Sequence, residues 1–176
     1  MQVTLAFVMS VDGFLLPEDG AQSRDWASKE DQAHFQELLK KNDAVVLGSN
    51  TYDAHKNYLL PVKGLLRVVM TRNPQQYQTE EKLGVLEFSP LPVSELLAVL
   101  ERRGYTKLLI AGGSALYKDF LAEKLVHDLF ITIEPLLFGD GLSAATGAAM
   151  RAKLQLINTV PLNEAGTLLL HYKVLY

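Results

Sequence analysis

Apolar runs alternate with amphipathic segments along the first two thirds of the chain, and this order predicts strands separated by helices. Dense apolar runs that stop at a turn-forming residue are typical of buried strands in a parallel sheet. Apolar positions that recur every three or four residues predict helices. The predicted strands are Val3–Met9, Ala44–Leu47, Leu66–Met70, Val85–Phe88 and Lys107–Ala111, the predicted helices are Ser28–Lys41, Asn50–Tyr58, Val93–Arg103 and Ser114–Leu121, and Pro17–Asp25 is predicted to be a polar loop.

The last third of the chain has strand-like segments with few helical signals between them. These segments are Val126–Glu134, Gln155–Val160 and Thr167–Leu175, and the tight turn Asn163–Gly166 joins the last two. Strands linked through helices pair in parallel, whereas strands joined by a short turn pair antiparallel. We therefore expect one α/β domain over residues 1–176, with a mixed, mainly parallel sheet, helices on both faces and a C-terminal antiparallel hairpin.

Composition narrows the classes of function. The 176 residues carry a net charge of −3 and no cysteine. The missing basic block argues against nucleic acid as a partner, and the missing cysteine excludes thiol nucleophiles, iron–sulfur clusters and cysteine-bound zinc. The N-terminus lacks the layout of a signal peptide, and no apolar run is long enough to cross a bilayer. We expect a cytoplasmic protein that has no membrane partner.

Asp31 is the strongest candidate for a chemical role. Its spacing from Ser28 matches a variant capping box, which by itself indicates only a carboxylate that stabilises a helix N-terminus. Helical spacing, however, groups Asp31 with Phe35, Leu38 and Leu39, and groups Glu30, His34, Glu37 and Lys41 on the other face. A carboxylate aimed at the core has a raised pKa that suits proton transfer. Capping and catalysis both remain open for Asp31.

Three loops follow predicted parallel strands, at the sheet edge where ligands of α/β proteins bind. They are Gly48–Thr51, Thr71–Asn73 and Gly112–Ala115. A glycine pair at a helix start lets the backbone approach an anion, although such a pair is often only a tight turn. A loop arginine such as Arg72 is often simply solvated, but this one is placed to hold a phosphate, for instance an adenosine 2′-phosphate. The full G-x-G-x-x-G pattern is missing.

Other chemistries lack their signatures. His34, His55, His127 and His171 show no metal-ligand spacing, so we assign them structural or surface roles and predict no metal. Neither a serine-hydrolase elbow nor a Walker loop is present.

These segments together resemble the dihydrofolate reductase superfamily, and in particular its branch related to the C-terminal reductase domain of the riboflavin-biosynthesis deaminase-reductase. The matching segments, in order, are Met9–Gly13, Trp26 with Asp31 and Phe35, Val46–Thr51, Met70–Arg72, Leu109–Tyr117 with Phe120 and Leu121, and Leu129–Pro135 leading into Phe138–Asp140. The resemblance covers most of the chain and implies a dihydrofolate reductase-like fold and an NADPH-dependent reductase.

The resemblance also implies roles for individual residues. Asp31 would engage the substrate heterocycle as the catalytic residue, and Ser10–Leu16 would be a mobile lid beside the nicotinamide. The implied substrate-binding residues are Ala6, Phe7, Val8, Trp26, Phe35 and Thr132. The implied NADPH-binding residues are Gly48, Ser49, Asn50, Thr51, Thr71, Arg72, Gly112, Gly113, Ser114, Ala115, Leu116 and Tyr117.

Departures from the family pattern leave the substrate open. Folate-using members carry an arginine where this chain has Leu65. Riboflavin-pathway domains carry a lysine, an arginine and an acidic residue where this chain has Ala6, Leu39 and Ala111. The leading expectation is reduction of the riboflavin-pathway aminouracil phosphate. Dihydrofolate reduction and a non-catalytic dinucleotide-binding module are the alternatives. Because relatives in this branch often dimerise, we also expect a homodimer paired through the hairpin edge.

Overall fold

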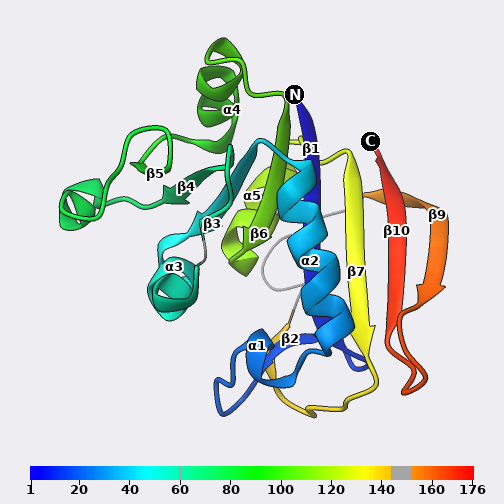
Figure 1. Cartoon of the computed structure of the whole chain (residues 1–176). Coiled ribbons are helices and arrows are strands. Elements are labelled where there is room, and N and C mark those ends of the chain that lie inside the picture. The colour runs from blue at the N-terminus through cyan, green and yellow to red at the C-terminus, as the bar shows by residue number, and fades with distance from the viewer. Residues whose placement is uncertain (60, 144–151) are drawn as a thin grey trace.

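A mixed sheet of eight strands, in the order β5-β4-β3-β6-β1-β7-β10-β9, organises the computed structural model, which describes residues 1–59, 61–143 and 152–176. Six strands run parallel, β10 pairs antiparallel with β7, and β9 pairs antiparallel with β10 at the edge (Figure 1). The expected fold class is thus confirmed. The strands are β1 (Gln2–Ser10), β3 (Ala44–Gly48), β4 (Leu66–Met70), β5 (Leu86–Ser89), β6 (Lys107–Gly112), β7 (Asp128–Glu134), β9 (Lys153–Pro161) and β10 (Leu168–Leu175).

Helices cover both faces of the sheet because successive strand residues point to opposite sides. On one face, Leu38 and Leu39 of α2 (Lys29–Lys41) pack in a cluster with Val45 of β3. The same face carries α3 (Ser49–His55), which continues into the 3-10 turn η1 (Lys56–Tyr58), and a second 3-10 turn, η2 (Pro74–Tyr77), packs there. On the other face, α4 (Val93–Arg102) and α5 (Ser114–Ala122) pack against Val46 and its neighbours.

Three short elements were not expected. Strand β2 (Phe14–Pro17) pairs with β8 (Gly141–Ser143) in a small second sheet, and α1 (Ser23–Trp26) is a single helical turn. The predicted polar loop Pro17–Asp25 is therefore wrong at both of its ends. The partner of β2 lies far along the chain, so no local pattern marks the pairing. A side chain at Gly141 would place its Cβ 2.0 Å from the Leu16 carbonyl oxygen, which shows how closely the two strands approach.

The segment Ser10–Leu16, expected to be a lid, is held by several contacts. Ser10 is fully buried, and its hydroxyl donates to Asp12 and accepts the backbone N–H of Phe14. The Asp12 carboxylate in turn accepts the backbone N–H groups of Phe138 and Gly139, the latter at 2.7 Å. Asp12 thus ties the β1–β2 turn to the loop after β7. Mobility of this segment remains a prediction.

In the part of the chain that the structure describes, no helix is long and apolar enough to cross a membrane.

Candidate functional site

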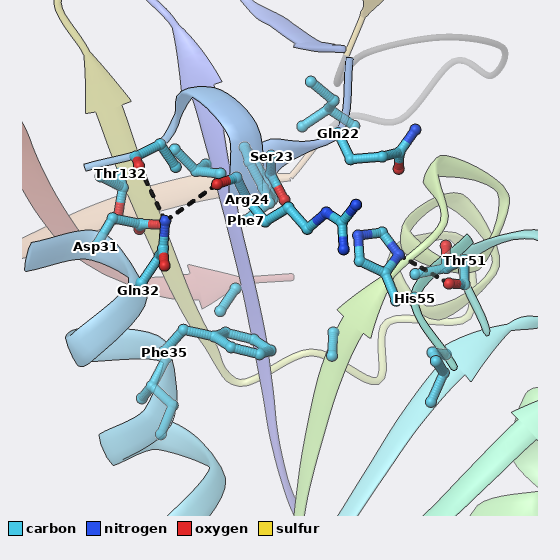
Figure 2. A pocket seen from close by; sticks show the side chains of 18 of the residues that line it. Phe7, Gln22, Ser23, Arg24, Asp31, Gln32, Phe35, Thr51, His55 and Thr132 are labelled. Atoms are coloured by element: carbon cyan, nitrogen blue, oxygen red, sulfur yellow. Dashed lines mark hydrogen bonds between the residues drawn. The ribbon is translucent and has the colours of Figure 1, made fainter. Parts of the chain in front are cut away.

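A cavity of about 440 Å³ lies on the face of the sheet that carries α2, near the carboxyl ends of β3 and β6. Strands β1, β3, β4, β6 and β7 of the main sheet form its floor, and α1, α2, α3, η1, α5 and the small sheet of β2 and β8 surround it. Figure 2 shows Asp31 and Thr132 together on one side of this space and Arg24 and His55 on the other. The carboxyl ends of parallel strands are where ligands bind in α/β sheets, so the cavity is the candidate active site.

Asp31 lies in the first turn of α2, with its backbone N–H bonded to the hydroxyl of the N-cap residue Ser28 at 3.2 Å. In a capping box the Asp31 carboxylate would accept the backbone N–H of Ser28, but that N–H donates to Glu134 instead, and the Asp31 side chain lines the cavity. Burial raises the pKa of Asp31 to about 6, with a smaller increase from the charge of Glu134 and an opposing decrease from a hydrogen bond to Thr132. Near neutral pH this carboxyl can therefore exchange a proton with a bound ring.

Glu134 anchors the start of α2 and went unnoticed in the sequence. The side chain is 3% exposed at the end of β7. One carboxylate oxygen accepts the backbone N–H of Ser28 at 2.8 Å, and the other accepts the hydroxyl of Thr167 at 2.6 Å. A buried acid with two donors holds the helix N-terminus in place. Glu134 therefore positions the turn that carries Asp31.

The raised pKa of Asp31 predicts a specific pH dependence of stability. Protonation favours the folded state, so the contribution of Asp31 is fully present below pH about 4, the pKa of an unfolded aspartate, and is lost as pH rises through about 6. Asp31→Asn removes this titration. We expect the free energy of unfolding of Asp31→Asn, relative to wild type, to rise by about 2 kcal/mol between pH 4 and pH 7. Urea unfolding at the two pH values measures it.

Glu134→Gln serves as the companion variant, because it keeps the side-chain shape and removes the charge. Loss of this like charge should lower the pKa of Asp31 part of the way toward its ordinary value, since burial remains the larger cause. Carbon NMR of the Asp31 carboxyl would follow the titration directly. An Asp31 pKa that does not change in Glu134→Gln would show that the two carboxyl groups are not coupled.

Apolar side chains surround the carboxyl. Ala6, Phe7, Val8 and Phe35 line the cavity as expected for substrate-binding residues, together with Thr132. Phe7 also stacks on Tyr117, with ring centroids 5.5 Å apart. Trp26 does not line the cavity: its ring packs edge-on against Phe138, and its Nε1–H donates to the carbonyl of Ala21.

His34 corrects the expected helix faces. It lines the cavity, and its ring lies 5.5 Å from that of Phe130. At about 100° per residue, His34 lies only about 60° around the helix from Asp31, so the inward face is wide enough to include it. Burial lowers the pKa of His34, and its Nε2 is buried without a hydrogen-bond partner among the described residues.

The glycine loops after β3 and β6 lie against each other. A Cβ added to Gly112 would lie 2.6 Å from Cγ2 of Thr51, and one added to Gly113 would lie 3.9 Å from Cα of Gly48. Gly113 has φ +92°, which favours glycine. It is also the N-cap residue of α5, and because glycine has no side chain, it cannot cap the first backbone N–H groups of that helix. This leaves backbone N–H groups at a helix start beside a narrow cradle, which fits the phosphates of a dinucleotide.

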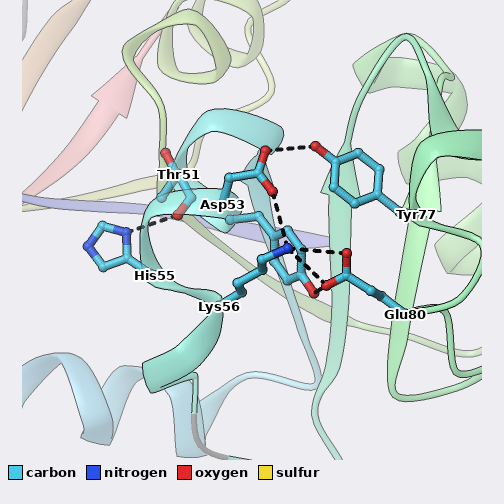
Figure 3. A network of polar contacts seen from close by, with 7 residues as sticks. Thr51, Asp53, His55, Lys56, Tyr77 and Glu80 are labelled. Atoms are coloured by element: carbon cyan, nitrogen blue, oxygen red, sulfur yellow. Dashed lines mark hydrogen bonds and ion pairs between the residues drawn. The ribbon is translucent and has the colours of Figure 1, made fainter.

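The Thr71–Arg72 loop follows β4, next to β3 in the sheet, so the three expected cofactor loops are neighbours. A polar network links α3 to the segment after this loop (Figure 3). Tyr77 donates to Asp53 at 2.8 Å, and Tyr52 donates to Glu80 at 2.8 Å. Lys56 lies 3.3 Å from Glu80. These bonds hold α3 and Lys56 against η2 and the residues that follow it.

The remaining expected cofactor residues differ in exposure. Thr51, Gly112, Gly113, Ser114 and Tyr117 line the cavity. Asn50, Arg72 and Ala115 are exposed at the same sheet edge, whereas Gly48, Ser49 and Thr71 are half-buried. The side chain of Leu116 belongs to the core beneath α5, so only its backbone is available to a ligand.

The cavity-lining residues that the sequence did not single out for the site include Arg24, His55 and Arg67, in addition to His34. Arg67 is 8% exposed, although it is an arginine within a strand. Its position in the apolar run Leu66–Met70 was the available signal, because an arginine in a buried strand calls for an explanation.

Comparisons with known proteins agree with this geometry. The fold is that of a dihydrofolate reductase-like α/β domain: the Enterococcus faecalis dihydrofolate reductase complexed with NADP(H) superposes with a TM-score of 0.71 at 21% identity, covering 98% of this chain and 96% of that one. The chain belongs to the RibD C-terminal domain family, whose model matches residues 1–165. These matches support a reductase of that family.

Individual relatives match nearly all of the chain. Protein YwjB of Bacillus subtilis is 29% identical over 97% of both chains. A structure from Shewanella sp. PV-4, provisionally assigned to riboflavin biosynthesis, has a TM-score of 0.81 at 20% identity and full coverage of both chains. The Thermotoga maritima diaminohydroxyphosphoribosylaminopyrimidine deaminase/5-amino-6-(5-phosphoribosylamino)uracil reductase has a TM-score of 0.77 at 18% identity, and the match covers 98% of this chain and 56% of that one.

Proposed function

We propose that this protein is an NADPH-dependent reductase of a small heterocycle, with 5-amino-6-(5-phosphoribosylamino)uracil as the substrate. The observation that carries the proposal is Asp31, a carboxyl whose pKa is raised to about 6 and which lines the same cavity as Gly112 and Gly113 of the glycine cradle. The family match supports the reductase class, and the name of the Thermotoga maritima neighbour supports the substrate. A non-catalytic dinucleotide-binding module has no need of such a carboxyl.

Each part of the cavity has a role in this proposal. The Asp31 carboxyl donates a hydrogen bond or a proton to the ring, and the hydrogen bond from Thr132 fixes its orientation. Phe35 and the neighbouring leucines keep water away from the reacting atoms. Glu134 holds the helix turn so that the carboxyl stays in place.

The backbone at Gly112, Gly113 and Ser114, together with Thr51, would hold the cofactor phosphates, and Arg72 would contribute its guanidinium at the adenosine end. NADPH, when bound, supplies the hydride. The complex of the Enterococcus faecalis neighbour with NADP(H) supports this choice of cofactor.

The direct test is NADPH oxidation by the purified protein, followed by absorbance, with the aminouracil phosphate and dihydrofolate offered in parallel. Oxidation with the aminouracil phosphate is the expected result. Leu65, where folate-using relatives carry an arginine, is buried at 3% exposure, so dihydrofolate should react poorly. Tight NADPH binding without turnover on either compound would favour the binding module instead. Fractionation of cells that express the protein would test the expected cytoplasmic location.

A homodimer paired through β9 is a further part of the proposal. All nine residues of this edge strand are exposed, and Leu154, Leu156 and Ile157 are 43%, 53% and 49% exposed. An exposed apolar edge strand is a template for pairing with a second copy. We expect Leu156→Glu to convert the dimer to a monomer in light scattering. Leu137→Glu, at a loop position that is 77% exposed, should leave the mass unchanged. A monomeric wild type at micromolar concentration would contradict this assembly.

A further inference from the structure

The turn between β9 and β10 lies close to the start of α2, the helix that carries Asp31. Figure 1 shows this turn and the first residues of α2 at the same end of the sheet. Asn163 begins the turn, and Thr167 comes directly before β10. Thr167 is 1% exposed, so its hydroxyl is buried. A buried hydroxyl needs hydrogen-bond partners, and those of Thr167 lead toward α2.

The side-chain amide of Asn163 makes three hydrogen bonds. Its Oδ1 accepts the backbone N–H of Thr167 at 3.1 Å. Its Nδ2 donates to Oγ1 of Thr167 at 3.0 Å and to Oε2 of Glu30 at 3.1 Å. An amide nitrogen has two hydrogens to donate, so both are used. Asn163 therefore joins the turn to Glu30, the residue directly before Asp31.

The hydroxyl of Thr167 passes this network on to Glu134 in a fixed direction. Its oxygen accepts a hydrogen bond from Asn163, and its own hydrogen is donated to the Glu134 carboxylate at 2.6 Å. A hydroxyl bonded to a carboxylate at this distance makes a strong, charge-assisted bond. The other oxygen of Glu134 accepts the backbone N–H of Ser28. The network that begins in the turn thus ends at the N-cap residue of α2.

The turn therefore holds the first turn of α2 at two points, one on each side of Asp31 in the sequence. One point is the N–H of Ser28, held through Glu134, and the other is the carboxylate of Glu30, held by Asn163. The first backbone N–H groups of a helix have no partner within the helix, so outside contacts decide how firmly that end is held. The position of Asp31 depends on these two contacts.

We propose that Thr167 and Asn163 are positioning residues for the reaction at Asp31, which they support by holding Glu134 and the first turn of α2. Their part in the reaction rests on the proposed function, but their support of Asp31 does not. Neither residue lines the cavity, so each acts through another group. If they served only to close the hairpin, replacing them would change stability and leave the titration of Asp31 as it is.

The test is carbon NMR titration of the Asp31 carboxyl in the full chain, for Thr167→Val and Thr167→Ser. Valine removes the hydroxyl, so Glu134 loses one of its two donors and holds the helix turn less firmly. Asp31 then gains contact with water. Because burial is the main cause of its raised pKa, that pKa should fall from about 6 by about half a pH unit or more. Serine keeps the hydroxyl and should restore the wild-type titration.

Hydrogen exchange of the Ser28 amide gives a second readout. Comparing it with the amide of Val46, which is fully buried in β3, separates local loosening from a loss of global stability. In Thr167→Val we expect Ser28 to exchange about ten-fold faster relative to Val46, the effect of losing about one hydrogen bond. Thr159→Val makes the same chemical change at an exposed position of β9 and should leave both readouts unchanged.

Asn163→Ala is the second variant, and it removes the contact with Glu30 while Thr167 can still donate to Glu134. The pKa of Glu30 should rise toward its ordinary value, because the bond from Asn163 is the main cause that lowers it. The pKa of Asp31 should fall less than in Thr167→Val. Asn163 is half-buried, so this variant also answers the question if Thr167→Val does not fold.

Two results would overturn the proposal. A wild-type pKa of Asp31 in the folded Thr167→Val and Asn163→Ala variants would show that the turn does not support Asp31. Equal effects of Thr167→Val and Thr167→Ser would show that the hydroxyl is not the cause. None of these measurements needs turnover, so a failed reductase assay and a failed positioning role are distinguished.

Discussion

Asp31→Asn is expected to lower turnover by about 100-fold while the affinity for NADPH stays within about two-fold of wild type. The amide keeps the size of the carboxyl but cannot carry the proton that a group with a pKa of about 6 exchanges near neutral pH. Cofactor affinity should persist because Asp31 lies on α2, whereas the glycine cradle follows β3 and β6. Steady-state kinetics with the substrate that supports oxidation, and NADPH titration by fluorescence, give the two readouts.

Thr132→Val is the matched control for this experiment. It removes the hydrogen bond to Asp31 and leaves the carboxyl in place, so turnover should fall only a few-fold, by about the worth of one hydrogen bond. The Asp31 pKa should rise further, since that bond lowers it. Unchanged turnover in Asp31→Asn would remove Asp31 from the chemistry.

Gly112→Ala is expected to weaken NADPH binding by about ten-fold or more and to destabilise the fold by about 1–3 kcal/mol. The added Cβ would lie 2.6 Å from Cγ2 of Thr51, a distance at which the Thr51 side chain or the helix α3 that carries it must move. Because the cradle is formed by these two loops, its shape changes with that movement. Fluorescence titration and thermal unfolding measure the two effects.

Thr51→Ser in the Gly112→Ala background provides the rescue. Serine lacks Cγ2, and the remaining hydroxyl oxygen lies 3.2 Å from the added Cβ, so most of the clash disappears and stability should return. Gly48→Ala distinguishes an effect on cofactor binding from an effect on protein stability. Its φ of −78° suits alanine, and nothing in the protein lies within 4 Å of the added Cβ. A loss of NADPH affinity in Gly48→Ala would therefore report the cofactor itself. Full affinity in both single variants would place the cofactor elsewhere.

Local patterns predicted most of the sheet and its helices. Continuous apolar runs such as Val3–Met9 and the helical spacing of Phe35, Leu38 and Leu39 are strong signals because burial on one face must repeat with the geometry of the element. The turn Asn163–Gly166 likewise marked the hairpin of β9 and β10, which the structure confirms. Asp31 was found because a carboxylate breaks an otherwise apolar face.

Contacts between residues far apart in the sequence gave no local signal of this kind. Strand β2 is too short to show a period, and its partner β8 follows far along the chain. Glu134 looks like an ordinary polar residue near the end of a strand, and only the fold brings it to Ser28 and Thr167. His34 was placed on the wrong face because the boundary of a helical face is not sharp in the sequence.

The sequence by itself determined the α/β class, the order along the chain of the strands of the main sheet and of helices α2 to α5, the loops with glycine or arginine at the strand ends, and the inward position of Asp31. These follow from short-range periodicity and turn chemistry, which neighbouring residues specify. Only the tertiary structure decided that Arg24, His55 and Arg67 meet in one cavity, that Glu134 supports Asp31, and that Thr51 packs against Gly112. These contacts join residues from different elements, so they depend on how the helices pack on the sheet.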